Sequence, residues 1–494
     1  MPRSILSASL VRPAWQCGSF RVEGPDEDAF TLGLESLQQL GRQVQGEGVL
    51  ALKRLHLVGP FPSESEWMFG EALGIPTLEV RRHPASASGL WGALAAASRD
   101  EDSPGQEAVV ASQLAPQRTE VSGPPRVSQG AAGVALLLGR EPGLAILRYA
   151  FQSHAPGRTP TIQRLVADWL ADLEVPSEGT GGIVLSTDGE LAQWRSVWGA
   201  AAPGISLAPV EPPPTSEGSP SAVRSAELLW ELARRLRTGN FGIVAEALRT
   251  RSGFAGFRLN GPVRWAGTWG AIDPGLRPPS ERFFDRSPAV NAVSQGAYVP
   301  HPRYLENLPG RWRLVGERCS RCRALTFPPS GRCRSCGQSD GLRAEAQPRQ
   351  NLPVEGVTTI GAGAQPTEFD FLVETAGSYD VAIVGLAPGV RATVQVTDAL
   401  PGQLRIGDRV RLVLRRLYAM EGEWRYGLKA VPGRTASEGP LAAEPVTGPS
   451  RRRASSGVPK PSRSIPRRRG ARAGSPRRRE GGGTSPPGLF RSRR

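Results

Sequence analysis

The 494-residue sequence lacks any run of about 18 consecutive apolar residues, the length that a helix needs to cross a lipid bilayer. We therefore expect no membrane span. Cysteine is also scarce, because the chain holds five and four of them lie between residues 319 and 336. One cluster and a remote thiol, Cys17, do not make the framework of a disulfide-bonded secreted protein. The pattern instead indicates a metal site in a protein of the reducing cytoplasm.

The body of the chain carries almost no net charge, although the formal net charge of the whole chain is +15. Residues 451–494 hold fourteen arginines, one lysine and one acid, and so carry +14 of that total. Residues 1–450 are therefore close to neutral. The tail has almost no apolar side chains to bury, so we expect residues 436–494 to be disordered. Two roles stay open for it: a solvated extension that aids solubility, or non-specific attachment to nucleic acid or another anionic surface.

The four clustered cysteines follow the pattern C-x2-C-x10-C-x2-C, formed by Cys319, Cys322, Cys333 and Cys336. Each C-x2-C turn places two thiolates on one edge of a tetrahedron, and two such turns close a site for one metal ion. Four sulfur ligands leave no position for water, so we expect a structural site that holds zinc. Iron in a rubredoxin-like site is the alternative, since tetrahedral sulfur ligation suits both metals.

Five short alternating or β-branched runs follow the cysteines between Leu352 and Pro432, separated by turn segments such as APG, LPG and EGE. Short strands at this spacing predict a small all-β barrel of the OB type. The paired prolines of LTFPPSGR, between the two cysteine pairs, predict the turn of a small ribbon.

The order of these segments resembles the acyl-CoA-associated zinc-ribbon/OB-fold family, Domain of Unknown Function 35 (DUF35), over roughly residues 297–432. That family has a helical lead-in, a four-cysteine ribbon with a Pro-Pro turn and an OB barrel. Its strand motifs GxRxxxQ(V/L)TD and (K/R)IGxxV are matched here by Gly389, Arg391, Gln395, Thr397, Asp398, Ile406, Gly407 and Val410. Members work beside thiolase-fold enzymes, and some bridge a thiolase and a hydroxymethylglutaryl-CoA (HMG-CoA) synthase. The resemblance therefore implies an enzyme partner of that class and CoA or acyl-CoA as a ligand.

The first 260 residues predict an α/β layered fold. GPDEDAFTLGLESLQQLGR begins with Pro25 and three acids, as a first helical turn does, and spaces Phe30, Leu34 and Leu37 for one buried face. Strand-like runs (SILSASLV, LKRLHLVGPF, QEAVVASQL, GAAGVALLLG) alternate with helix-like runs (SESEWMFGEAL, SGLWGALAAAS). Over residues 1–150 the sequence resembles the thiolase fold of archaeal HMG-CoA synthases, through GPDEDAxT at the helix start and the SQGAAGVALLLG strand.

The catalytic residues that this resemblance implies are absent or displaced. The nucleophile position holds Ser86, whose hydroxyl stays protonated at neutral pH and attacks a thioester poorly without a dedicated base. Phe61 stands where the synthases have a general acid/base glutamate, with Glu64 nearby as a shifted substitute. The synthases also have a histidine in a segment with the sequence HQPNG. If residues 183–190 correspond to that segment, this chain lacks the histidine, whereas a rival alignment places it at His154.

These observations predict a multidomain protein with an α/β thiolase-like domain that is truncated, a rubredoxin-like zinc ribbon, an OB barrel and a basic tail. The predicted boundaries are 1–260 for the thiolase-like domain, 261–296 for a linker, 297–345 for the lead-in and ribbon, 346–435 for the OB-fold and 436–494 for the tail. The leading functional prediction is a non-catalytic accessory or scaffold subunit. It would dock on an active thiolase or HMG-CoA synthase-like enzyme and contribute to binding or transfer of a CoA thioester.

Two alternative functions stay open. The chain is a residual acyltransferase or condensing enzyme if Ser86 acts with His154 or Glu64. It is a nucleic-acid-binding protein if the OB barrel and the tail act together, with stacking platforms supplied by Phe369, Phe371, Tyr379, Trp424 and Tyr426. The nearly neutral body favours the interpretation that these aromatic side chains fill the barrel and its flank, because a groove for a strand of nucleic acid carries its own positive charge.

Overall fold

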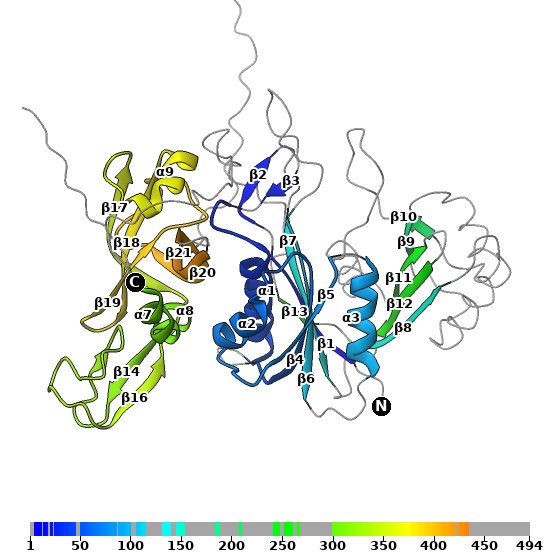
Figure 1. Ribbon diagram of the computed structural model, residues 1–494, viewed down its shortest axis with the longest axis horizontal. Helices are drawn as coiled ribbons and strands as arrows, with labels where there is room; N and C mark the ends of the chain where they lie inside the picture. The colour runs from blue at the N-terminus through cyan, green and yellow to red at the C-terminus, as the bar shows by residue number, and fades with distance from the viewer. Residues whose placement is uncertain are drawn as a thin grey trace, which may run out of the picture. The chain divides into compact units, whose positions relative to one another are not determined.

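A computed structural model of the chain describes residues 4–114 with gaps at 12, 18–19, 23, 46–49, 86 and 100–104, residue 131 with the strand that follows it, six further strands up to residue 266, and residues 299–433 except 421–422 (Figure 1). Residues 1–434 form one compact unit, which is the larger unit of the chain. The tail that the composition predicts to be disordered lies outside the described residues. Within the described part, no helix is long and apolar enough to cross a membrane.

A mixed sheet organises the first part of the larger unit. Its strands are β1 (Ser4–Val11), β4 (Leu52–Val58), β5 (Glu79–His83), β6 (Gln106–Gln113), β7 (Ala132–Gly139), β8 (Ala145–Ser153), β9 (Ile183–Thr187), β10 (Leu207–Pro209), β11 (Phe241–Ala247), β12 (Arg251–Leu259) and β13 (Arg264–Ala266). They run in the order β10-β9-β11-β12-β8-β1-β7-β6-β4-β5, with β13 paired to β1. A short hairpin of β2 (Trp15–Cys17) and β3 (Phe20–Val22) stands apart from this sheet and contains Cys17.

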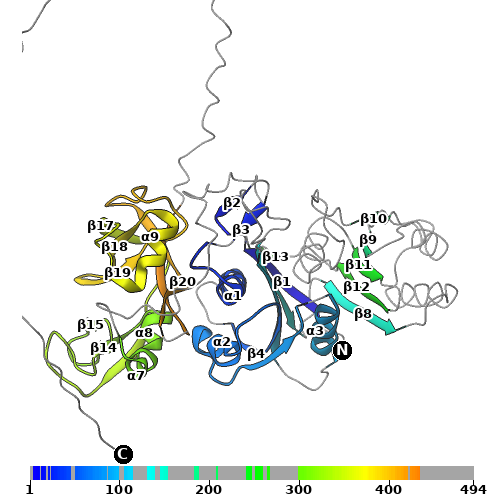
Figure 2. The same ribbon diagram turned by 45° about the horizontal axis from the view of Figure 1, so that its top comes forward.

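Helices α1 (Ala29–Gln45) and α2 (Ser65–Leu73) lie on one side of strands β4, β6 and β7, and α3 (Ala87–Arg99) lies on the other (Figures 1 and 2). Strand alternation explains this layering, since Leu55 and Leu57 of β4 join the core beneath α1 while His56 faces the opposite way. The predicted apolar face of α1 is confirmed, because Phe30 and Leu37 are fully buried. Burial of each such side chain stabilises the fold by about 2 kcal/mol.

Two short helices precede the small sheet around which the cysteines lie. The helices are α7 (His301–Glu306) and α8 (Leu308–Arg313), and the strands are β14 (Val315–Cys319), β15 (Leu325–Thr326) and β16 (Leu342–Ala346), in the antiparallel order β15-β14-β16. The predicted helical lead-in is thus present. The predicted turn around the paired prolines begins directly after β15.

Five antiparallel strands follow: β17 (Leu352–Gly361), β18 (Ser378–Ala387), β19 (Val390–Gln395), β20 (Arg409–Met420) and β21 (Glu423–Pro432). Each matches one of the five predicted runs. Their order is β19-β18-β17-β20-β21, and a parallel bridge between Val396 and Ala430 joins the two ends of this order. A 3-10 turn (Thr367–Phe369) and α9 (Asp370–Ala376) stand between β17 and β18.

One large hydrophobic core connects α1, α2 and strands β4, β6 and β7 with α7, α8 and the five-stranded sheet. Phe30 of α1 lies 5.3 Å from Tyr426 of β21 and 6.0 Å from Trp312 of α8, measured between ring centroids. Trp312 also stacks on Trp67 of α2 at 5.7 Å. The part built on the mixed sheet and the five-stranded part therefore share buried aromatic side chains. The predicted boundaries at residues 260, 296, 345 and 435 stay predictions.

Candidate functional site: a four-cysteine centre and a buried ionic interface

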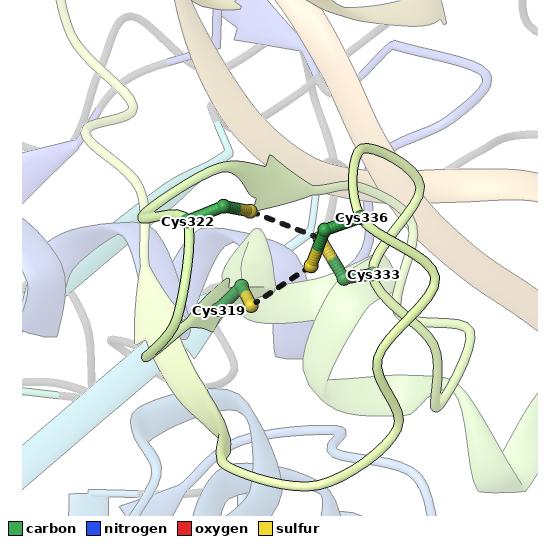
Figure 3. Close-up of side chains that lie close together, drawn as sticks. All are labelled: Cys319, Cys322, Cys333 and Cys336. Atoms are coloured by element: carbon green, nitrogen blue, oxygen red, sulfur yellow. Dashed lines mark hydrogen bonds between the residues drawn. The ribbon is translucent and has the colours of Figure 1, made fainter.

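The four predicted metal ligands come together in space (Figure 3). Cys319 ends β14, Cys322 follows it, and the other two come from the loop between β15 and β16. All four sulfur atoms lie within 4.8 Å of one another, with 3.7 Å between Cys319 and Cys336 and 3.5 Å between Cys322 and Cys333. A tetrahedron with metal–sulfur bonds of about 2.3 Å has edges of about 3.8 Å. The cluster therefore fits a structural metal ion such as zinc.

The backbone around Cys319 and Cys333 favours the thiolate form, which is the form that binds a metal. The amide of Cys336 lowers the pKa of Cys333 to about 6 by hydrogen bonding to its sulfur. The amide of Cys322 lowers the pKa of Cys319 in the same way. Each C-x2-C turn is also closed by a backbone hydrogen bond of 2.9 Å, from Arg323 to Cys319 and from Gly337 to Cys333.

A second polar cluster, which we call the ionic interface, lies where the start of α1 meets β20 and β21. It brings together five carboxylates and four cations from distant parts of the sequence: Asp26, Glu27, Asp28, Glu35 and Asp398 with Arg411, Arg415, Arg416 and Lys429. Most of these side chains are buried. Charges in such surroundings have lost their hydration, so each needs partners within the protein.

Arg415 is the centre of the ionic interface. Its guanidinium lies 3.1 Å from Glu27, 2.8 Å from Glu35 and 3.2 Å from Asp398. Arg411 donates to the other oxygen of Glu35 at 2.6 Å. The carboxylate of Glu35 is therefore held by two arginines that stand almost 400 residues away in the sequence.

Asp28 links helix capping to the interface. Its Oδ1 accepts a hydrogen bond from the backbone amide of Thr31 at 2.8 Å, which caps the start of α1. Its Oδ2 accepts from Arg416 at 2.9 Å and from the hydroxyl of Tyr426 at 2.7 Å. Lys429 pairs with Asp26 at 2.9 Å beside it. The start of α1 is thus fixed by residues of β20 and β21.

The carboxylates of the ionic interface differ in pKa because the cations are unevenly shared. Burial alone would raise the pKa of Glu35, but Arg411 and Arg415 lower it to about 2. Burial raises the pKa of Glu27 well above its ordinary value, and burial also raises that of Asp398. Glu27 and Asp398 are therefore the carboxylates of the ionic interface that bind a proton most readily.

Sequence reasoning identified the acids at residues 26–28 as the first turn of a helix and did not pair them with anything. The arginines of β20 carried a usable signal. Val410, Leu412 and Leu414 point into the five-stranded core, so Arg411 and Arg415 share the opposite face of the strand. Two cations on one strand face require either water or acids as neighbours.

The predicted catalytic residues do not form a site in the described part of the chain. Ser86 and His154 lie outside the described residues. Phe61 is buried, and its ring packs 5.8 Å from that of Phe69. Glu64 is exposed just before α2, where a hydrogen bond from Ser63 lowers its pKa. A general acid needs the opposite shift.

A row of interacting polar side chains on β4, β5 and β6 was not predicted from the sequence. Nε2 of His56 lies 3.3 Å from buried Glu107, and its Nδ1 lies 3.1 Å from Nε2 of His83. Arg54 pairs with Glu107 at 2.9 Å. Burial, His56 and Arg81 lower the pKa of His83 to about 4, so the imidazole of His83 is neutral at physiological pH. The row ties three adjacent strands together.

The aromatic residues proposed as stacking platforms pack against the protein itself. Tyr379 and Tyr426 are buried. Phe369 contacts Tyr379 with ring centroids 6.0 Å apart, and Phe371 contacts Trp424 at 5.6 Å. The guanidinium of Arg416 covers the ring of Trp424 at 4.7 Å. These contacts agree with the interpretation that the side chains fill the barrel and its flank.

Comparison with known proteins places the chain in a family. No protein-family model matches it. A DUF35 domain-containing scaffold protein of Methanothermobacter thermautotrophicus is 30% identical over 135 residues, which are 94% of that relative and 26% of this chain. This chain belongs to the DUF35 domain-containing scaffold proteins. A DUF35 scaffold protein of Methanocaldococcus jannaschii is 28% identical over 141 residues, covering 89% of it.

Similar solved structures cover about half of the chain. The acyltransferase ChlB3 shares 14% identity at a TM-score of 0.39, covering 54% of this chain and all of that structure. PksG, an HMG-CoA synthase of Bacillus subtilis, shares 13% at 0.37, covering 53% and 80%. A 3-oxoacyl-(acyl-carrier protein) synthase of Burkholderia xenovorans shares 13% at 0.40, covering 54% and 96%.

Proposed function

We propose that this DUF35 protein is a scaffold subunit of acyl-CoA metabolism that holds its DUF35-type half on a thiolase-like half of its own chain. The observation that carries the proposal is the ionic interface, which joins residues 26–35 to residues 398–429 through buried ion pairs. The related scaffold proteins are matched over 89–94% of their length by about 140 residues. They have no room for a second half of this size.

A metal ion stabilises the ribbon in this proposal, and zinc is the metal we propose. The cysteines that would hold it are Cys319, Cys322, Cys333 and Cys336. With four sulfur ligands the metal serves folding rather than catalysis. The OB-type barrel formed by β17–β21 and a cytoplasmic location belong to the same proposal, since free thiols persist in a reducing compartment.

The partner that we propose is an active thiolase or HMG-CoA synthase-like enzyme, with a CoA thioester as the shared ligand. The chain itself is non-catalytic in this proposal. Support comes from Phe61, which places a buried ring where a general acid/base would stand, and from Glu64, whose exposed carboxylate has the wrong pKa shift for an acid.

Affinity capture tests the scaffold role. The full chain with an N-terminal tag is purified at physiological salt after nuclease treatment from cells that make it, and bound proteins are identified by mass spectrometry. We expect one thiolase-fold enzyme in near-stoichiometric amount. Recovery of the chain alone, or with nucleic-acid-binding proteins that nuclease releases, would contradict the scaffold role. An Arg415→Met variant, which breaks the ionic interface, serves as the matched comparison.

A further inference from the structure

The first C-x2-C turn borders a positively charged hollow that the metal site does not explain. The hollow has a volume of about 480 Å³ and is lined by Arg318, Cys319, Ser320, Arg323 and Arg343. Sites for small ligands in proteins have volumes of about 300–1,000 Å³. Three arginines among five lining residues make this hollow suited to an anion.

Arg323 stands at a backbone position that favours glycine. Its φ is +59°, in the left-handed region, and its amide closes the first C-x2-C turn by donating to Cys319. The equivalent position of the second turn is Gly337, with φ +75° and the matching hydrogen bond to Cys333. A side chain at such a position costs free energy that glycine avoids. An arginine therefore occupies a position at which glycine would adopt the same backbone conformation at a lower cost in free energy.

Arg343 stands opposite another arginine. It is the cross-strand neighbour of Arg318 in the pair formed by β14 and β16, and like charges in that arrangement repel. Arg318 is neutralised by Glu345 through two hydrogen bonds of 2.8 and 2.6 Å. Within the described residues, neither Arg323 nor Arg343 has an ion pair. Two uncompensated guanidinium groups thus line one hollow.

Hydrogen bonds around the hollow fix its backbone, and they do not involve the guanidinium groups of Arg323 and Arg343. Arg318 donates to the backbone carbonyl of Arg323 at 2.8 Å, and the amide of Ser320 donates to the carbonyl of Gly341 at 3.0 Å. A guanidinium forms paired hydrogen bonds with phosphate oxygens. Two guanidinium groups whose backbone positions are fixed bind a phosphate more tightly than two charges on a mobile surface segment.

We propose that this hollow binds the phosphate groups of a small phosphorylated ligand. The choice of CoA as the source of these phosphates rests on the proposed function, since CoA carries a diphosphate and a 3′-phosphate at its nucleotide end. Free diphosphate offers the same chemistry. The hollow would then hold the polar end of a CoA thioester at the ribbon.

Calorimetric titration of the full chain tests this site. The probes are inorganic diphosphate, CoA and dephospho-CoA at physiological salt, and the variants are Arg323→Gly and Arg343→Gln. Because glycine suits the backbone at position 323, the first variant removes a charge while keeping the fold, and its midpoint of thermal unfolding should not fall. Each variant should weaken binding of diphosphate and CoA by about tenfold or more. Arg321→Gln, an exposed charge of the same turn outside the hollow, should leave both unchanged.

The outcomes separate this site from the scaffold role. Equal weakening of CoA and diphosphate by both variants supports the site, and a weaker titration with dephospho-CoA adds that the 3′-phosphate is held there. Unchanged CoA binding in both variants overturns the site while the scaffold role stands on affinity capture.

Loss of bound metal with unchanged anion binding also overturns the site, since the arginines then only offset the charge of the metal–thiolate cluster. Binding of single-stranded RNA that depends on Arg323, without binding of diphosphate, overturns it in favour of a nucleic acid. All variants share the same arginine-rich tail, so its contribution cancels.

Discussion

At the scale of single residues, the ionic interface assigns different protonation states to carboxylates that look alike in the sequence. Glu35 has two arginine partners that lower its pKa to about 2, whereas Glu27 competes for Arg415 with two other acids and its pKa is raised by burial. Ion pairs of this kind contribute little net stability compared with apolar packing, but loss of one partner leaves a buried charge without compensation. The effect of a mutation therefore depends on which carboxylate is changed.

Replacement of the two glutamates by glutamine separates these states. Glu35→Gln should lower the free energy of unfolding by about 3 kcal/mol at pH 7, because it leaves Arg411 and Arg415 short of a negative charge. Glu27→Gln should cost about 1 kcal/mol or less, since burial raises the pKa of Glu27 and so makes its replacement by a neutral amide of the same shape less costly. Urea unfolding of both variants measures the difference. Equal losses would show that Glu27 is ionised.

The stability of the larger unit should fall as the solution becomes acidic. The pKa of Glu35 is about 2 in the folded chain against an ordinary 4.5, so its contribution is full above pH 4.5 and is lost as the pH falls towards 2. The loss is about 3 kcal/mol. Glu27 has the opposite sign: its contribution is full below its ordinary pKa and is lost as the pH rises through its raised value. Unfolding measured from pH 2 to 9 should show the acid slope in the wild type and a smaller one in Glu35→Gln.

At the scale of elements, the ribbon depends on its two C-x2-C turns. The sheet of β14, β15 and β16 is small, and β15 has only two residues. Sheets of this size bury too little apolar surface to be stable alone. The five-stranded sheet of β17–β21 contributes Val384, Leu412 and Ala430 to the large shared core, so it does not need the metal in the same way.

Metal removal should therefore affect the two sheets differently. Cys333→Ser, or treatment with a chelator, should release one metal ion per chain and expose the amides of β14–β16 to hydrogen exchange. The amides of β17–β21 should stay protected. Elemental analysis and hydrogen–deuterium exchange by mass spectrometry measure both effects. Protection of β14–β16 that survives complete metal loss would contradict a structural metal.

The sequence predicted individual helices and strands, but it did not predict which of them pack against one another. Apolar alternation and turn residues predicted each of β17–β21, and helical spacing predicted the buried face of α1, because these patterns are local. The acids at residues 26–28 also had a sufficient local explanation as a helix start, so nothing local required a distant cation. The pairing of Asp28 with Arg416 follows only from the folding of the chain. The chain Glu107–His56–His83 was missed for the same reason, since its members are more than 20 residues apart.

At the scale of the whole chain, the larger unit couples the part built on the mixed sheet to a DUF35-type part. The coupling is apolar as well as ionic: Trp312 lies between Phe30, Trp67 and Tyr426, and its indole donates to the backbone of Tyr426 at 3.1 Å. A core shared in this way predicts one cooperative unfolding transition for the larger unit. Two independent domains would unfold in two steps.

Removal of this shared tryptophan should separate the two parts. Trp312→Ala should lower the free energy of unfolding by about 4 kcal/mol and split the calorimetric transition, because it leaves a cavity between α1, α2 and β21. Trp67→Ala is the matched control. Trp67 stacks on the same ring but is 46% exposed, so its loss should cost about 1 kcal/mol and keep one transition. Two transitions in the wild type would contradict the shared core.

A double-mutant cycle between Glu35 and Arg415 tests the docking of the two parts most directly. The two side chains lie 2.8 Å apart and 380 residues apart in the sequence, so they interact only if the DUF35-type part is docked on α1. Unfolding is measured for the wild type, Glu35→Gln, Arg415→Met and the double variant. The account predicts a coupling free energy of about 2 kcal/mol or more. Additive effects, with a coupling below about 0.5 kcal/mol, would contradict it.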